Sequence, residues 1–449
     1  MPPYPSVPDA PPSAVRWRVM WWLAIASVVA YVLRFNLSVA GPAMMHDLGL
    51  TEAQLGLVLG AFAWSYGLLQ VPGGMLGERF GPRRTLAVAF VCWFATTALM
   101  ALVPHGLPLV ASMGMLLLLR AAQGVTQAPI FPVACGAYFA WLPPSSWGLA
   151  NSLSAAGTTV GAALAGPGIA WLVGAVGWRQ SFLAVAPLAL VLALGWWHDY
   201  RDDPATHRGT NAAELALIQG GRAPAFHAAP VPWIKLLAHR DILCLTLGYA
   251  CMNYVFYLFF NWFFYYLTEI RHVTSALAGA FTAAQWMIGA VTALAGGWTC
   301  DRLSTRLGAR HGCRVTAVSA LLVCAPLLVA GTLATSPVLN VTLLSLAFGC
   351  TQFVDSAYWA ATMRIAGPQA QSATGLMNTG GNVAGGIGAV LVPLLAAPFG
   401  WSVALGSGAL CALGAAALWF AVRADLALQE GGGPVAPGLL QPVILTVPA

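Results

Sequence analysis

The feature that most constrains this chain is a series of apolar runs, each about 20 residues long, that recurs along almost its whole length. A run of that length crosses the roughly 30 Å hydrocarbon core of a bilayer as a helix. With 59% hydrophobic and 8% charged residues, a water-soluble globule would expose too much apolar surface. The sequence therefore predicts an all-α integral membrane protein. Its formal net charge of +6 describes loops and gives no argument for nucleic-acid binding.

The runs fall into two groups of six, separated by a polar stretch. The predicted spans are residues 18–41, 54–76, 84–103, 108–138, 147–174 and 180–198, then 240–267, 276–299, 314–334, 338–363, 372–396 and 401–422. We therefore expect a disordered cytoplasmic tail over 1–15, a six-helix bundle over 16–198, a cytoplasmic linker over 199–239, a second six-helix bundle over 240–423 and a cytoplasmic tail over 424–449.

An internal repeat relates the two groups. The stretch from Gly73 to Arg84, interpreted as a short glycine-rich loop between two spans, has its counterpart in the stretch from Gly296 to Leu303. Three pairs of positions share an offset of 223 residues: Gly73 with Gly296, Glu78 with Asp301, and Arg79 with Arg302. A constant offset indicates two structural copies of one unit. We expect Gly73, Gly74, Glu78, Arg79, Asp301 and Arg302 to form a conformational latch.

The distribution of cations predicts the orientation. Of the 20 Lys and Arg residues, 16 fall on one side of the predicted spans and two, Arg179 and Arg271, fall on the other. By the positive-inside rule both termini and the linker are cytoplasmic, in the inner membrane of the cell.

The two remaining cations, Arg34 and Arg120, lie inside predicted spans. An arginine at that depth costs about 2.5–3.5 kcal/mol, so it faces a cavity or a partner. Two planar guanidinium groups in one cleft suit a carboxylate, which each can hold with two hydrogen bonds. The alternative is that both arginines pair with buried acids, but of 14 Asp and Glu residues only Asp355 is clearly inside a span.

Local motifs add a resemblance. The stretch Gly73 to Arg84 resembles the loop after the second helix of the major facilitator superfamily. Within it, the chain is similar to the anion:cation symporter family over residues 16–423. The motifs that carry this likeness are Tyr31-Val32-Leu33-Arg34-Phe35-Asn36, Phe62-Ala63-Trp64-Ser65-Tyr66, Arg120 with Gly124, Gly177-Trp178-Arg179, Tyr358-Trp359 and Gly375-Leu376-Met377-Asn378.

The resemblance implies two pseudo-symmetric six-helix bundles with one midplane site, and it implies the residues of that site. Substrate contacts would come from Arg34, Tyr66, Arg120, Trp359 and Asn378. For Trp359, packing or gating is an equal alternative.

The chain also departs from the family. The family's proton-carrying acids are replaced by Leu33 and Gln127, neither of which can titrate. Asp355 is therefore the candidate for proton coupling, unless coupling has been lost.

These observations predict a secondary transporter for a small organic anion, such as a sugar acid, that works by alternating access with or without protons. A proton-independent facilitator or an exporter of the same fold is the alternative. A membrane-embedded enzyme is a remote one, because the sequence has no His-Glu-x-x-His motif, no intramembrane Asp pair and no Ser–His pair. No catalytic residue, cofactor or metal is predicted, since the nine cysteines lack metal-ligand spacing.

Overall fold

The computed structural model describes residues 11–425, except 105, 107, 144–146, 220–235, 237 and 367–369. The predicted tails therefore lie mostly outside the described residues, as does much of the linker. The first half contains α1 (Val15–Leu48), α2 (Glu52–Leu68), α3 (Gln70–Met100), α4 (Leu109–Gln127), α5 (Ile130–Trp141), α6 (Trp147–Val176), α7 (Trp178–Val185) and α8 (Pro187–Asp199). The short helices η2 (Pro204–Thr206) and α9 (Ala212–Gln219) follow. The second half contains α11 (Arg240–Tyr265), the π-helical turn η3 (Tyr266–Ile270), α12 (Ser275–Leu307), α13 (Ala309–Leu333), α14 (Pro337–Ala366), α15 (Ala370–Phe399) and α16 (Trp401–Ala421).

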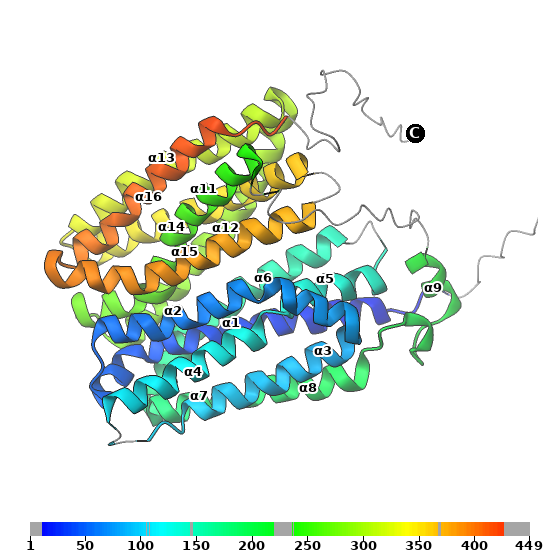
Figure 1. Cartoon of the computed structure of the whole chain (residues 1–449), viewed down its shortest axis with the longest axis horizontal. Helices are drawn as coiled ribbons and strands as arrows, with labels where there is room; N and C mark the ends of the chain where they lie inside the picture. The colour runs from blue at the N-terminus through cyan, green and yellow to red at the C-terminus, as the bar shows by residue number, and fades with distance from the viewer. Residues whose placement is uncertain are drawn as a thin grey trace, which may run out of the picture.

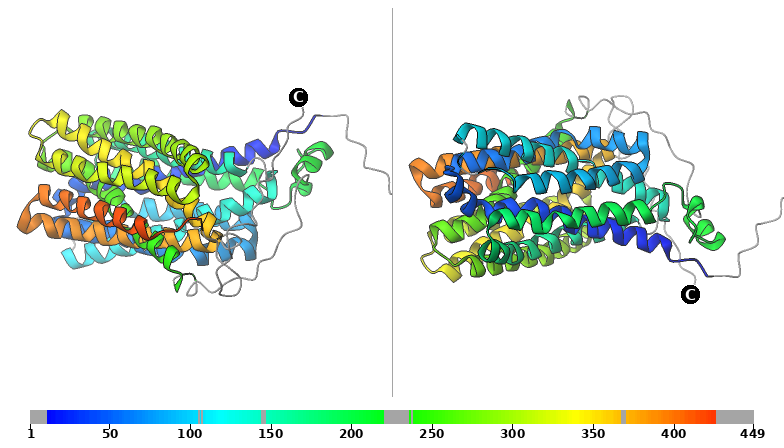
Figure 2. Two further views of the ribbon diagram at one scale, coloured as in Figure 1. Left: turned by 90° about the horizontal axis from the view of Figure 1, so that it is seen from above. Right: turned by 90° about the horizontal axis from the view of Figure 1, so that it is seen from below.

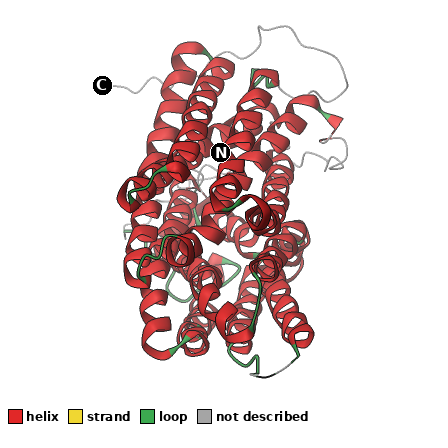
Figure 3. Cartoon of the chain, turned by 90° about the vertical axis from the view of Figure 1, so that its left-hand side faces the viewer, coloured by secondary structure: helices red, strands yellow, loops and turns green. Residues whose placement is uncertain are grey.

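The long helices run side by side in two groups, with α1–α8 in one and α11–α16 in the other (Figure 1). Views from above and below show the same two groups (Figure 2), and the view from the side shows helices joined by short loops (Figure 3). We call the end that carries α9 the terminal end, and the other the opposite end.

Ten helical segments of the described chain are long and apolar enough to cross a membrane, or eleven if the bent pair α2–α3 counts as one span. That pair covers the second and third predicted spans together. The helix α3 extends from the end of the second predicted span into the third. Its one residue with non-helical backbone angles is Gly81, with φ 79° and ψ 153°. The all-helical membrane fold is as predicted.

The two halves repeat one backbone device. Gly177, which precedes α7, has φ 86° and ψ 164°, and Gly400, which precedes α16, has φ 81° and ψ 161°. The two glycines lie 223 residues apart, and each is followed by tryptophan. Gly81 and Gly308 have the same conformation at the other hairpins. This region of φ favours glycine, so the repeat is built into the turns as well as into the latch stretch.

The interpretation of Gly73–Arg84 as a loop is wrong. Residues 70–80 are helical, and the chain turns only at Gly81. The counterpart stretch likewise lies within α12. The glycines serve close helix packing: a Cβ on Gly73 would lie 3.0 Å from Pro129, and one on Gly77 would lie 2.5 Å from Val133 of α5.

Glycines also bring the two halves together. A Cβ on Gly56 of α2 would lie 2.3 Å from the carbonyl oxygen of Ala389 in α15. One on Gly60 would lie 3.0 Å from the carbonyl oxygen of Gly386. Where α6 meets α12, a Cβ on Gly166 would similarly lie 3.0 Å from a backbone oxygen of Gly279. Small residues allow this approach of backbones within a membrane.

The described part of the linker packs on the first half. The carboxylate of Glu214 in α9 is fully buried and accepts hydrogen bonds from the backbone N–H groups of Val15 and Arg16 at 3.3 and 3.0 Å. It also forms an ion pair of 3.0 Å with the Arg16 side chain. A carboxylate at the first turn of α1 satisfies free N–H groups and complements the helix dipole.

Candidate functional site

The two membrane-depth arginines lie together in the first half. Arg34 of α1 is 3% exposed and Arg120 of α4 is 1% exposed. One Arg120 Nη donates to the backbone oxygen of Arg34 at 3.0 Å, and the other donates to Gln123 Oε1 at 2.6 Å. Gln123 in turn donates to Thr97 Oγ1 of α3 at 3.3 Å. Arg120 is therefore fixed from three helices.

Arg34 has a different polar partner. Its Nε and Nη2 atoms both donate to Gln127 Oε1 of α4, at 3.3 and 3.2 Å. Gln127 is completely buried. It occupies the position where the family resemblance implies an acid, and the structure places a neutral amide against the guanidinium.

Aromatic rings surround both guanidinium groups. The Arg34 Cζ lies 4.9, 4.6 and 4.4 Å from the ring centres of Tyr31, Phe62 and Tyr66. The Arg120 Cζ lies 4.7 Å from the same Phe62 ring. Such contacts stabilise a cation by about 0.5–2 kcal/mol each. The rings therefore stabilise the buried positive charges in part, as a counter-ion would, but they do not neutralise them.

No ion pair between described residues includes Arg34 or Arg120. Pairing with buried acids, the alternative from the sequence, is therefore not seen in this part of the chain. Two buried donors at the site, Arg120 Nε and Gln127 Nε2, also have no hydrogen-bond acceptor among the described residues. The arrangement presents positive charge and unpaired donors, which are the groups that suit an acceptor-rich anion.

The second half contributes an acid from within one of its membrane helices. Asp355 of α14 is partly exposed and accepts a hydrogen bond from Tyr249 Oη of α11 at 3.1 Å. Trp359 lies one turn further along α14, with its ring centre 6.3 Å from that of Tyr249. The charges of Arg34 and Asp355 both act on the Tyr31 hydroxyl, but Asp355 forms no ion pair with either arginine among the described residues.

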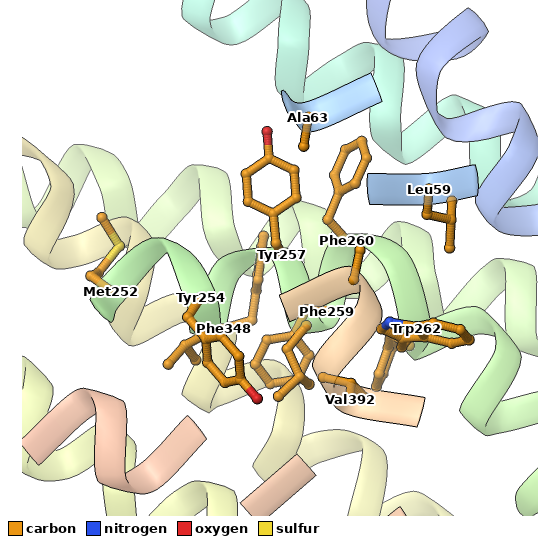
Figure 4. Packing of buried hydrophobic residues seen from close by; sticks show 14 of the residues in the cluster. Leu59, Ala63, Met252, Tyr254, Tyr257, Phe259, Phe260, Trp262, Phe348 and Val392 are labelled. Atoms are coloured by element: carbon orange, nitrogen blue, oxygen red, sulfur yellow. The ribbon is translucent and has the colours of Figure 1, made fainter. Parts of the chain in front are cut away.

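Asn378 lies where the halves meet. Its Nδ2 donates to Gln70 Oε1 of α3 at 2.9 Å, and its backbone oxygen accepts from Asn382 Nδ2 at 2.8 Å. Asn382 Oδ1 accepts from Tyr257 Oη of α11 at 2.7 Å. Tyr257 and its neighbour on α11, Phe260, point toward α2 (Figure 4). In this conformation Asn378 thus links the halves.

The expected latch residues are not engaged with one another across the halves. Glu78, Arg79, Asp301 and Arg302 are all exposed, and among described residues none of them forms an ion pair. Each arginine instead lies over a ring of its own helix, at 5.2 and 5.1 Å. Their role as a latch stays a prediction.

The opposite end has a contact that sequence reasoning missed. Glu52 of α2 accepts hydrogen bonds from Tyr265 Oη at 2.8 Å and from Trp401 Nε1 at 3.4 Å. The donors belong to α11 and α16, so this carboxylate joins the two halves. The repeated Gly-Trp pair was the signal that could have identified Trp401.

The comparisons with known proteins agree with this architecture. The model of the Major Facilitator Superfamily matches residues 23–389. A probable sulfoacetate transporter, SauU, of Cupriavidus necator is 31% identical over 379 residues, which cover 84% of this chain and 86% of that protein. A D-galactonate transporter of Escherichia coli O6:H1 is 28% identical over 411 residues, covering 88% and 93%.

Solved structures show the same fold. A bacterial homolog of the human lysosomal transporter Spinster, in an inward-facing and unoccupied conformation, superposes with a TM-score of 0.74 at 18% identity, covering 90% of this chain and 96% of that one. A D-xylose-proton symporter gives 0.71 at 14% identity, covering 91% and 98%. The extent of the family match and the 31% identity together show that this chain is a secondary transporter of the Major Facilitator Superfamily.

Proposed function

We propose that the protein moves a small organic anion with a carboxylate, such as a sugar acid, across the membrane by alternating access. The observation that carries this proposal is the pair of buried guanidinium groups of Arg34 and Arg120, which have no acidic partner among the described residues. Two cations at membrane depth need a counter-charge, and an anionic substrate supplies it. The relatives named for sulfoacetate and D-galactonate support the same class.

The remaining site residues have roles that fit a hydroxylated carboxylate. Arg34 and Arg120 hold the carboxylate, while Tyr66 and Asn378 hydrogen-bond hydroxyl groups. Trp359 covers the substrate or gates its path. The Asn378–Gln70 contact then has to change when the halves move.

The proposed transport cycle rocks two bundles, residues 16–198 and 240–423, around the midplane site. Both termini and the linker over 199–239 are cytoplasmic, in the inner membrane, as the 16-to-2 division of cations supports. Gly73, Gly74, Glu78, Arg79, Asp301 and Arg302 latch one state. A cysteine placed at residue 203, in a variant without the native cysteines, should resist an impermeant thiol reagent in intact cells. Labelling without permeabilisation would contradict this orientation.

Two modes of energy coupling are open to this fold. In a symporter, Asp355 carries the proton, because it is an acid inside a membrane helix and lies one turn before Trp359 on α14. In a proton-independent facilitator or exporter, no group titrates during the cycle. The neutral residues Leu33 and Gln127 favour this second mode. The family assignment counts against the membrane-embedded enzyme.

The proposal is tested with purified protein in liposomes. Uptake of radiolabelled D-galactonate and sulfoacetate should be saturable, and D-galactose, which lacks the carboxylate, should not compete. Imposing a pH gradient then separates the two coupling modes. The absence of uptake and of binding for a panel of carboxylates and sulfonates, with the protein folded, would contradict the proposed substrate class.

A further inference from the structure

We propose that Gln127 is the positioning residue of the anion site: its amide oxygen orients Arg34, and its neutrality leaves the charges of Arg34 and Arg120 to the substrate. The inference rests on the proposed function and adds a consequence for it. Anion binding in the first half should not require a proton, whatever Asp355 does elsewhere in the cycle.

The geometry around Gln127 determines the orientation of its amide. A guanidinium only donates hydrogen bonds, so the Gln127 atom that meets Arg34 Nε and Nη2 has to be the oxygen. The amide nitrogen is then turned away from Arg34. It is buried and has no acceptor in the described part of the chain, and the same is true of Arg120 Nε.

Unpaired buried donors are costly. Here one unpaired donor, Nε, belongs to the Arg120 guanidinium, and the other belongs to the amide that contacts Arg34. The partners present around them are amides, a backbone oxygen and aromatic rings. A carboxylate or sulfonate offers several acceptor atoms and a negative charge. It therefore supplies both the missing hydrogen-bond acceptors and the missing counter-charge. A neutral sugar offers acceptors but no charge.

The charged and titratable groups around Gln127 come from four helices besides its own. Arg34 of α1 donates to Gln127, and the rings of Tyr31 of α1 and Tyr66 of α2 lie against the Arg34 guanidinium. Arg120 lies on α4 with Gln127, and Tyr257 of α11 lies within electrostatic range of both guanidinium groups.

Asp355, on α14, accepts a hydrogen bond from Tyr249 and exerts its charge on Tyr31 of this group. In the described chain α3 contributes the uncharged Thr97 and Trp93. Gln127 itself cannot gain or lose a proton, so it adds no protonation step of its own to anion binding.

Gln127→Glu tests the inference because it adds a charge where the amide stands. The carboxylate should pair with Arg34, raise the Tm of the ligand-free protein by at least about 2 °C, and compete with the substrate. We expect the Kd for D-galactonate, D-glucarate or sulfoacetate, measured by titration calorimetry, to rise at least about tenfold at pH 7.5. Gln54→Glu, in the capping box of α2, is the matched control and should change neither quantity.

Gln127→Leu is the second variant and keeps the test possible if Gln127→Glu does not fold. It removes the orienting oxygen without adding charge, so it should weaken anion binding and should not raise the Tm. In wild type and in Asp355→Asn, Kd for sulfoacetate should change less than about twofold between pH 6 and 8. The Asp355→Asn series separates any proton effect of that acid from the arginine pair.

The outcomes distinguish this inference from the proposed function. A raised Tm in Gln127→Glu, with no binding of the three anions to wild type, would contradict the proposed substrates and support the positioning role. Wild-type Tm and Kd in folded Gln127→Glu, or wild-type Kd in folded Gln127→Leu, would overturn the inference.

Discussion

The two halves use the same Gly-Trp hairpin for different purposes. In the first half, Trp178 Nε1 donates to Asp47 Oδ2 at 3.1 Å, and both residues belong to that half. In the second half, the equivalent Trp401 donates to Glu52 of the other half. The position that corresponds to Asp47 at the 223-residue offset is Ile270, which cannot accept this bond. The copy of this turn in the first half thus stabilises that half internally, whereas the copy in the second half joins the two halves.

The charges at membrane depth are divided in a similar way. The first half carries Arg34 and Arg120, whereas the second carries Asp355. Backbone turns and helix packing follow the repeat, while the side chains at the site and at the opposite end differ. An asymmetric substrate needs different groups on its two sides, and a pseudo-symmetric backbone allows both halves to move about it.

The largest effect is expected from closing the space between the halves. Gly56→Leu would place side-chain atoms where Ala389 now approaches, 2.3 Å from an ideal Cβ. The opposite end could then not close, and uptake into liposomes should fall at least about tenfold, since overpacking costs about 1–3 kcal/mol or more. Gly114→Leu, on α4 with nothing within 4 Å of a Cβ, should leave uptake unchanged. Normal uptake in Gly56→Leu would show that this contact is not needed.

A second effect concerns the acid of the second half. Asp355→Asn keeps the size of the side chain and the acceptor for Tyr249 but removes the negative charge. If the protein is a symporter, accumulation driven by a pH gradient should be lost while exchange of substrate across the membrane persists. Liposome uptake with and without the gradient measures both. Unchanged proton-driven accumulation in the variant would rule out Asp355 as the proton carrier.

A smaller effect is expected at the contact between the halves. Glu52→Gln should replace two charge-assisted hydrogen bonds by weaker neutral ones, a loss of about 1 kcal/mol. The population of the conformation in which the halves are separated at the opposite end should therefore rise a few-fold. Spin labels at Leu102 and Ser336, exposed residues of the two halves, report this as longer distances in a cysteine-free background.

Asp47→Asn is the matched control for that experiment, because Asp47 binds Trp178 and Arg179 within the first half. It should affect stability and leave the distance distribution unchanged. Equal shifts in both variants would remove the distinction between an internal and a bridging carboxylate.

The membrane fold could be predicted from the sequence because long apolar runs leave few alternatives. Arg34 and Arg120 were identified for the same reason, since charge within such a run is costly. The partners were harder to predict. Tyr31 reaches Arg34 by the three-residue spacing within α1, which the sequence contains. Phe62 is an ordinary apolar residue of its run, and only the packing of α2 against α1 and α4 brings it to both guanidinium groups.

The same limit explains the errors. The stretch after Gly73 has loop-like glycines, but those glycines are the surface on which α5 packs, so the helix continues to Phe80. The contact of Glu52 with Trp401 joins residues 349 positions apart, and no local pattern specifies it. Asn378 was expected at the substrate, whereas its present partner is Gln70 of the other half.

The central claim is that the two arginines bind the carboxylate of the substrate, and conservative substitution tests it most directly. Arg34→Lys and Arg120→Lys keep the charge but remove the planar pair of donors, so each should weaken binding of D-galactonate or sulfoacetate by about 1–3 kcal/mol. Arg271→Lys, at the opposite end with backbone partners only in the described chain, should bind as wild type. Titration calorimetry on folded variants gives the answer: wild-type affinity in both Arg34→Lys and Arg120→Lys would contradict the account.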